Sequence, residues 1–275
     1  MIYHNPGYCM GNRSRREKFL VALGILANPW MLLLDKLGLA KHPTYQTRTG
    51  MSFQTRGQTT DINDAVVVLS GKEYPPELMG LEDSRQQYND RPRVVLDCGG
   101  HIGTFSMYVK SHWPLTKIFA MEPVPDNQKL FQKNIARNQL KDVVMIPYAL
   151  YGESGTFYID LAGKQYDAVH IASERPGHDQ FIEINALTLD QVITDNNIPL
   201  IDLIKLDVEG AEYHIFRHSR ETLKKNVQRI IMEFHPAGDK AKRDELVGSL
   251  VADNAFELIY ETKNILGFDN LQLEK

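Results

Sequence analysis

From Arg91 onward, short apolar runs alternate with longer segments in which apolar and polar residues are mixed. Short apolar runs bounded by turns predict buried strands, and the mixed segments between them predict crossover helices. The strands of this series are expected at residues 94–97, 117–122, 143–146, 201–207 and 229–234, and its helices at 104–111, 125–140, 211–225 and 240–253. The alternation predicts a doubly wound α/β fold with a mostly parallel sheet.

Two further pairs of strands depart from the parallel pattern. Residues 156–160 and 181–184 alternate between apolar and polar positions, which predicts two antiparallel strands joined by a polar loop. Residues 189–196 read as a helix. Residues 256–261 and 265–273 predict a closing antiparallel pair, and this pair brings the main sheet to seven strands.

The first ninety residues show no such alternation. Residues 19–34 form an apolar helical run, and Ala65–Leu69 predicts a strand. We therefore divide the chain into two parts. Residues 1–90 are an N-terminal extension of helices and strands, expected to cap the site or to contact substrate or a second subunit. Residues 91–275 are the main domain.

The apolar run at residues 19–34 follows a basic segment, and this order resembles a signal sequence or a short membrane anchor. However, the run is broken by Asn28-Pro29 and is shorter than the roughly 20 residues that a membrane-spanning helix needs. We expect a pair of helices that cover the main domain, with no transmembrane segment. Peripheral membrane contact through residues 19–34 stays open.

Composition narrows the class of protein further. The net charge of -4 argues against a nucleic-acid partner, because proteins that bind nucleic acids normally carry an excess of basic residues. The two cysteines, Cys9 and Cys98, do not make a disulfide scaffold, and no Cys/His spacing fits a zinc site. We expect a cytoplasmic protein that forms a homo-oligomer.

A glycine-rich turn follows the first strand of the parallel series, in Asp97-Cys-Gly-Gly-His-Ile-Gly103. Glycine lets the backbone turn tightly and approach a ligand closely. Asp97 would repel a pyrophosphate, so the turn suits a cationic ligand with an ammonium and a sulfonium; alternatively, Asp97 caps the next helix. Glu122, at the end of the second strand, can accept hydrogen bonds from both ribose hydroxyls of an adenosine group.

More polar side chains follow the last two strands of the parallel series. Asp207 and Glu209 share a face if their strand continues through them, and Glu212 falls in the first turn of the next helix, where the dipole favours an acid. Glu233 and His235 end the neighbouring strand, and His235 is a candidate general base. Asp207, Glu209, Glu233 and His235 could also hold a divalent ion, although no metal is predicted.

With these motifs in view, the chain resembles the FkbM family of methyltransferases. The matching pieces run from Arg91 to the C-terminus: Val95-Leu-Asp-Cys-Gly-Gly-His-Ile-Gly-Thr-Phe-Ser, Glu122-Pro, Leu187-Thr-Leu-Asp190, Ile204-Lys-Leu-Asp-Val-Glu-Gly-Ala-Glu212 and Glu233-Phe-His235. Cys98 and His101 depart from the usual family residues without removing the turn. The resemblance implies a Rossmann-like class I fold and transfer of a methyl group from S-adenosylmethionine, often to oxygens of sugars, polyketides or related secondary metabolites. The expected cofactor-binding residues are Asp97, Gly99, Gly100, Gly103, Glu122, Ala149 and Asp207.

The working hypothesis is an in-line methyl transfer in which the protein aligns the reactants. His235 or Asp207 removes the proton of a hydroxyl on a small-molecule acceptor, and Glu209 and Glu233 hold acceptor hydroxyls. The N-terminal extension and the loop at 162–179 would cover the cleft. The rivals are an NAD(P)-dependent oxidoreductase and a non-catalytic adenosyl-binding module. The sequence names neither the acceptor nor the acceptor atom, oxygen or nitrogen.

Overall fold

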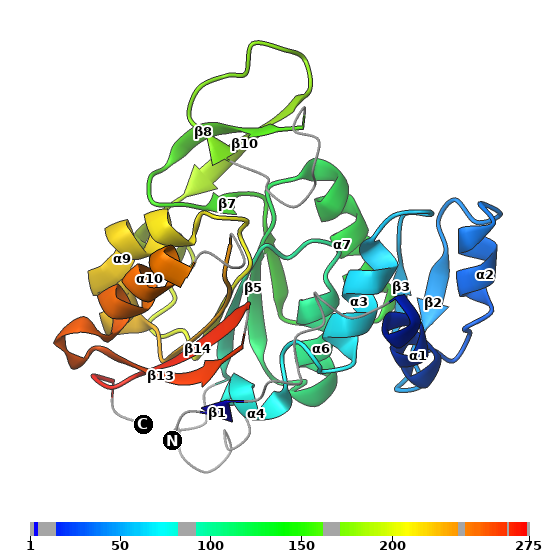
Figure 1. Ribbon diagram of the computed structural model, residues 1–275, viewed down its shortest axis with the longest axis horizontal. Coiled ribbons are helices and arrows are strands. Elements are labelled where there is room, and N and C mark those ends of the chain that lie inside the picture. Colours follow the sequence, from blue (N-terminus) through cyan, green and yellow to red (C-terminus); the bar gives the residue numbers. More distant parts are fainter. Residues whose placement is uncertain are drawn as a thin grey trace.

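The computed structural model describes residues 3–4, 15–81, 92–161, 171–235, 240–262 and 264–273. Its centre is an eight-stranded sheet in the order β1-β13-β14-β12-β11-β4-β5-β6 (Figure 1). The strands are β1 (Tyr3–His4), β4 (Val94–Cys98), β5 (Lys117–Met121), β6 (Val143–Ile146), β11 (Leu203–Leu206), β12 (Arg229–Glu233), β13 (Phe256–Glu261) and β14 (Ile265–Asn270).

The predicted α/β fold with a mostly parallel sheet is confirmed. β4, β5, β6, β11 and β12 pair in parallel, and β14 runs antiparallel to both β12 and β13. The predicted strand number of seven was wrong by one, because the short β1 pairs in parallel with β13 at the edge. A two-residue strand gives too little alternation to be recognised in a sequence.

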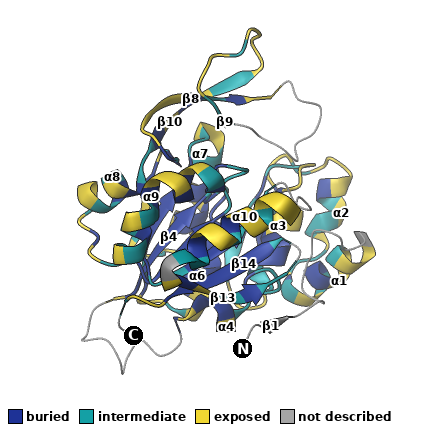
Figure 2. Cartoon of the chain, turned by 60° about the vertical axis from the view of Figure 1, so that its left-hand side comes forward, coloured by how far each residue is buried: buried dark blue, intermediate teal, exposed yellow. Residues whose placement is uncertain are grey.

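Helices cover both faces of the sheet, which is why its central strands are apolar on both sides (Figure 2). Successive residues of one strand enter different cores: Val95 faces the core shared with α6 and α7, and Leu96 faces the core shared with α8, α9 and α10. The helices are α6 (Thr104–His112), α7 (Pro125–Arg137), α8 (Leu189–Asp195), α9 (Glu212–Asn226) and α10 (Lys240–Val251), followed by the short 3-10 turn η1 (Ala252–Asn254). An ion pair between Arg243 of α10 and Glu261 joins α10 to β13.

A second, four-stranded sheet rises above the carboxyl ends of the main strands (Figure 1). Its strands are β7 (Ala149–Leu150), β8 (Gly155–Asp160), β9 (Ile171–Ala172) and β10 (Phe181–Leu187). β8 and β10 pair antiparallel, as the alternation predicts. Residues 162–170 of the loop expected to cover the cleft lie outside the described residues.

The N-terminal extension contains α1 (Arg15–Ile25), α2 (Met31–Lys36), β2 (Thr44–Gln46), β3 (Ser52–Gln54), α3 (Asp61–Leu69) and α4 (Pro76–Met79). The pair of helices expected in the apolar run is confirmed as α1 and α2. Within the described residues, no helix has the length and apolar character that crossing a bilayer requires. The strand predicted at Ala65–Leu69 was wrong, because these residues belong to α3.

The apolar run of α3 explains that error. Ala65 to Val68 are all buried, between α1 on one side and α6 on the other. A helix buried on all sides shows the same short apolar run as a buried strand, so periodicity does not separate the two. Because α3 joins the core that also holds Val95, the extension packs as part of the main body.

Candidate functional site

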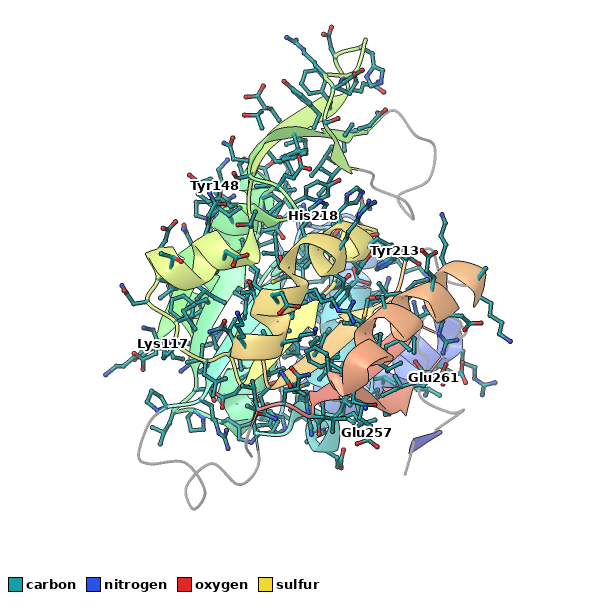
Figure 3. The ribbon with its side chains drawn as sticks, turned by 90° about the vertical axis from the view of Figure 1, so that its left-hand side faces the viewer. Lys117, Tyr148, Tyr213, His218, Glu257 and Glu261 are labelled. Carbon is teal, nitrogen blue, oxygen red and sulfur yellow. The ribbon has the colours of Figure 1, made fainter. Side chains whose placement is uncertain are left out.

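The candidate site lies at the carboxyl ends of β4, β5, β11 and β12. The chain adds β5 and β6 on one side of β4 and later adds β11 and β12 on the other. The strand order therefore reverses between β4 and β11, and ligands of such sheets bind at this crevice. In Figure 3, Lys117 marks the edge of the sheet where the parallel strands begin, and Tyr148, just beyond β6, marks the edge where they end.

The glycine turn packs tightly against its neighbours. Gly99 has φ +79°, and a Cβ added there would lie 1.9 Å from the carbonyl oxygen of Asp207. Added Cβ atoms at Gly100 and Gly103 would each lie 3.1 Å from the ring of Phe131. Three glycines that were expected to admit a ligand are thus also required by the contacts of β4 with β11 and α7.

Asp97 is fully buried beneath this turn. It accepts a hydrogen bond from Ser106 Oγ at 2.7 Å, and its Oδ1 lies 3.6 Å from Lys205 Nζ. The N-cap of α6 is Gly103, which has no side-chain cap, so the alternative interpretation of Asp97 as a helix cap is wrong. Burial raises the pKa of Asp97, although Lys205 and Ser106 oppose the rise.

Lys205 is a site residue to which the sequence analysis gave no role. Its buried ammonium donates to the carbonyl oxygen of Gly99 at 2.9 Å and lies 3.3 Å from Asp207 Oδ2. Burial alone would lower the pKa of Lys205, but the charges of Asp207 and Asp97 raise it above its usual range. The lysine therefore stays charged and links the ends of β4 and β11. One charged residue inside an otherwise apolar strand was the available signal.

Glu122 follows β5, and its carboxylate is buried. It accepts hydrogen bonds from the backbone nitrogens of His101 at 2.8 Å and Val124 at 2.9 Å, and from Asn127 Nδ2 at 3.1 Å. Burial raises the pKa of Glu122 in spite of these bonds. Since a carboxylate offers about four acceptor positions, these described donors leave room for one further hydroxyl. Two ribose hydroxyls, as expected from the sequence, would have to displace one of these donors.

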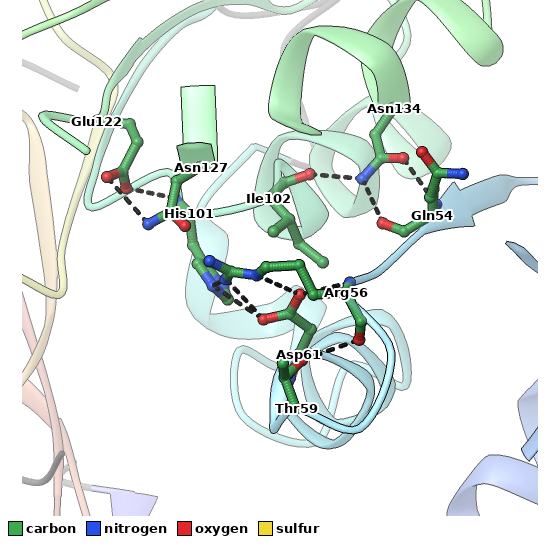
Figure 4. A network of polar contacts seen from close by, with 9 residues as sticks. All are labelled: Gln54, Arg56, Thr59, Asp61, His101, Ile102, Glu122, Asn127 and Asn134. Atoms are coloured by element: carbon green, nitrogen blue, oxygen red, sulfur yellow. Dashed lines mark hydrogen bonds and ion pairs between the residues drawn. The ribbon is translucent and has the colours of Figure 1, made fainter. Parts of the chain in front are cut away.

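The extension reaches the glycine turn through Arg56 and Asp61 (Figure 4). Arg56 binds Asp61 with both Nε at 2.9 Å and Nη2 at 2.7 Å, and the same Nη2 lies 2.9 Å from His101 Nε2. Burial would raise the pKa of Asp61, but its bonds from His101 and Arg56 outweigh burial and lower it. Asn134 of α7 adds a second link, because it donates to the carbonyl oxygens of Gln54 and Ile102. No individual role was assigned to Arg56 or Asp61 from the sequence.

A second group of polar residues lies at the ends of β11 and β12. Asp207, Glu233 and His235 each offer one atom, and these three atoms lie within 4.8 Å of one another. They could supply two oxygens and one nitrogen to a divalent ion. Glu209, the fourth residue of the expected metal set, is not in this group, although its Oε2 lies 3.7 Å from His235 Nε2.

Glu209 is positioned by the backbone rather than by strand alternation. β11 ends at Leu206, so the strand does not continue through Asp207 and Glu209 as the shared-face argument required. Glu209 has φ +53° and precedes Gly210 at φ +97°. This left-handed turn directs the chain into α9, whose first residue, Glu212, is buried.

His235 is surrounded by carboxylates. Its Nδ1 lies 3.3 Å from Glu212 Oε1, and its Nε2 lies 4.0 Å from Glu233 Oε1. Burial lowers the pKa of His235, but the bond to Glu212 and the charges of Glu209, Glu212 and Glu233 outweigh it and raise the pKa to about 9. His235 is therefore a cation at neutral pH, which favours hydrogen-bond donation over proton removal.

The carboxylates around His235 behave differently. Burial and the charge of Asp207 raise the pKa of Glu233 to about 7, although His235 and Lys205 oppose the rise. Glu73, from the extension, lies within electrostatic reach of Glu233 and Asp207, and burial raises its pKa well above the usual range. A carboxylate with a pKa near 7 can accept a proton at physiological pH. Glu73 gave no signal in the sequence, because it precedes a loop-like Tyr74-Pro-Pro segment.

Ala149 lies apart from these groups. It is buried in β7, where it pairs with Ala186 of β10. Its contact with a cofactor remains a prediction.

A doubly wound sheet with a glycine turn and an acid after the second parallel strand is an arrangement that many nucleotide-binding enzymes share. The family model described as the methyltransferase FkbM domain matches residues 97–265. This match covers more than half of the chain, and the chain belongs to the FkbM methyltransferase family. The resemblance seen in the sequence is thereby confirmed.

Three relatives are 24% to 27% identical to this chain over the aligned residues. Methyltransferase sdnD of Sordaria araneosa is 27% identical in an alignment 194 residues long, which covers 60% of this chain and 73% of the relative. Hexuronic acid methyltransferase AglP of Haloferax volcanii is 25% identical over 76% of this chain and 81% of its own. The 31-O-demethyl-FK506 methyltransferase FkbM of Streptomyces tacrolimicus is 24% identical over 58% of this chain and 69% of its own. A crystal structure of methyltransferase FkbM from Methylobacillus flagellatus KT is 15% identical, with a TM-score of 0.45, over 77% of this chain and 55% of that one.

Proposed function

We propose that this protein is an S-adenosylmethionine-dependent O-methyltransferase whose acceptor is a hydroxyl of a sugar, a polyketide or a related secondary metabolite. One observation carries the proposal. The glycine turn and Glu122 lie at the ends of β4 and β5, and a proton-accepting carboxylate beside a cationic histidine lies at the ends of β11 and β12. Relatives named for a hexuronic acid and for 31-O-demethyl-FK506 support an oxygen acceptor.

The residues of the glycine turn and Glu122 fit an adenosyl cofactor. Glu122 keeps one acceptor position for a ribose hydroxyl, and Asp97 and Asp207 supply negative charge beside the turn. When bound, the cofactor supplies a methyl carbon that its sulfonium already activates. Lys205 holds the two acids at a fixed separation, because it is buried between them. The protein's main contribution is then to position the acceptor.

The proton of the acceptor hydroxyl has to leave as the new bond forms. The sequence nominates His235 or Asp207 for this step, but the charges around His235 keep it protonated at neutral pH. We therefore assign proton removal to Glu233, whose pKa is about 7. His235 donates a hydrogen bond to Glu212, and its positive charge stabilises the Glu233 carboxylate. Asp207 and Glu209 hold acceptor hydroxyls.

The first test is calorimetric titration with S-adenosylhomocysteine, with NAD in parallel. We expect micromolar binding of S-adenosylhomocysteine alone, weakened at least about ten-fold in Glu122→Ala because a buried acceptor of a ribose hydroxyl is lost. Binding of NAD instead would revive the oxidoreductase alternative and overturn the proposal.

The second test separates an enzyme from a non-catalytic adenosyl-binding module. Transfer of a labelled methyl group to sugar and polyketide hydroxyls is measured for the unmodified protein, Glu233→Gln, His235→Ala and Asp207→Ala. We expect turnover in the unmodified protein and its loss in each variant, with S-adenosylhomocysteine binding retained in Glu233→Gln. Cofactor binding without any turnover across the acceptors would favour the binding module.

A further inference from the structure

The short helix α2 presents an apolar stripe to solvent. Trp30, Leu33 and Leu37 are 60%, 60% and 59% exposed. Trp30 and Leu37 flank α2 and share its helical backbone, so these residues follow the i, i+3, i+7 spacing of one helical face. A surface helix of a soluble protein normally turns such a face toward the core. Here the apolar face points outward.

The opposite face of α2 is fixed by a buried carboxylate. Asp35 accepts hydrogen bonds from the hydroxyl of Tyr45 and from the backbone nitrogen of Gln58, both at 2.7 Å. Tyr45 is itself fully buried and stacks on Phe53. Rotating α2 to bury its stripe would leave Asp35 without these partners, so the outward orientation is built into the fold.

Exposed apolar side chains are concentrated in this lobe, which consists of α1, α2, β2 and β3 and lies to one side of the main sheet (Figure 1). Of the ten large exposed apolar side chains in the described residues, six fall between Phe19 and Leu39. Isolated exposed leucines are ordinary, but a concentration of this kind marks an interaction surface.

The charge of this lobe identifies the partner. Residues 15–54, from the start of α1 to the end of β3, contain six Lys and Arg against two Asp and Glu, a net charge of +4 in a chain whose total is -4. Lys36 and Lys41, beside the stripe, are exposed. A second copy of this chain docked about a two-fold axis would bring the same basic surface against itself. An anionic surface that also accepts apolar side chains satisfies both the charge and the stripe.

We infer that this lobe docks peripherally on an anionic lipid bilayer. Trp30, Leu33 and Leu37 enter the interfacial region, and Lys36 and Lys41 contact lipid phosphates and carboxylates. Trp suits this position, because its ring is apolar and its indole N–H is polar. The attachment is weak and reversible, since the stripe is short. This inference is independent of the methyltransferase site.

The test measures binding to vesicles of phosphatidylcholine alone and of an equimolar mixture with phosphatidylserine. The chain has two tryptophans, so Trp113→Phe leaves Trp30 as the single tryptophan, which is excited selectively at the red edge of the absorption band. We expect co-sedimentation with the anionic vesicles and a blue shift of Trp30 emission. Binding should be at least about ten-fold weaker to the neutral vesicles, and Lys36→Glu with Lys41→Glu should weaken anionic binding similarly.

Matched variants distinguish binding through the stripe from nonspecific adsorption to vesicles. Leu33→Ser with Leu37→Ser should abolish co-sedimentation, whereas Leu115→Ser, at a residue 70% exposed outside the lobe, should bind as the unmodified protein does. Retained binding in the double stripe variant, or no binding to anionic vesicles by the unmodified protein, overturns the proposal. Self-association that the double stripe variant abolishes, without vesicle binding, would instead assign the stripe to a second copy.

Discussion

Replacing Gly99 by alanine tests how the end of β4 is built. The added Cβ would lie 1.9 Å from the carbonyl oxygen of Asp207, and neither partner is a flexible side chain that can move away. Gly99 also has φ +79°, a conformation that costs an L-residue about 1–2 kcal/mol. Displacing a packed backbone adds about 1–3 kcal/mol. We expect a total loss of about 2–5 kcal/mol, a large part of the roughly 5–15 kcal/mol that stabilises a typical domain.

Two other glycines provide matched comparisons. At Gly100 the Cβ would lie 3.1 Å from the ring of Phe131, which can shift, so Gly100→Ala should cost about 1 kcal/mol. Gly248 lies on the exposed face of α10 with no atom near its Cβ position, so Gly248→Ala should stabilise the protein by up to about 1 kcal/mol. The expected order of stability is Gly248→Ala, unmodified protein, Gly100→Ala, Gly99→Ala.

The assay is urea unfolding followed by circular dichroism. With a slope of about 1–3 kcal/mol per M, Gly99→Ala should lower the midpoint by about 0.7 M or more. Calorimetry on the folded variant should also show weaker S-adenosylhomocysteine binding, because relief of the clash moves the end of β11 that carries Asp207. A Gly99→Ala protein with unchanged midpoint and affinity would refute the close approach of the two strands.

Three further outcomes follow from the site. The kcat/KM for the acceptor should rise as the pH increases through about 7, because Glu233 loses its proton, and it should fall above about 9, because His235 loses its proton. If the rise near pH 7 persists in the residual activity of Glu233→Gln, the assignment of Glu233 is contradicted. Asp61→Asn should weaken S-adenosylhomocysteine binding several-fold, since Arg56 and His101 lose their common partner, and calorimetry at constant pH detects this. Methyl transfer should survive EDTA, and a loss restored by Mg²⁺ would show that Asp207, with Glu233 and His235, holds an ion.

The periodicity of the sequence determined the type of most elements. Short apolar runs such as Val94-Val-Leu-Asp97, which alternate with longer mixed segments, predicted buried strands between helices, and the turn residues marked where each strand ended. Because parallel strands place their carboxyl ends at one edge, the order of strands and turns along the chain was enough to assign Asp97, Glu122, Asp207 and Glu233 to one crevice. Periodicity predicted the wrong element for α3, because its buried run Ala65 to Val68 lacks the alternation that separates a helix from a strand.

Contacts between distant segments were decided only by the tertiary structure. Arg56 and His101 are 45 residues apart, and the bond between them makes the extension part of the turn's support. The protonation of His235 likewise depends on Glu212 and Glu209, which a different strand and turn bring to it. Local sequence determines which conformation a segment prefers, because periodicity acts over a few residues. Burial and the distance between charges set a pKa or a binding geometry, and these quantities exist only once the whole chain has folded.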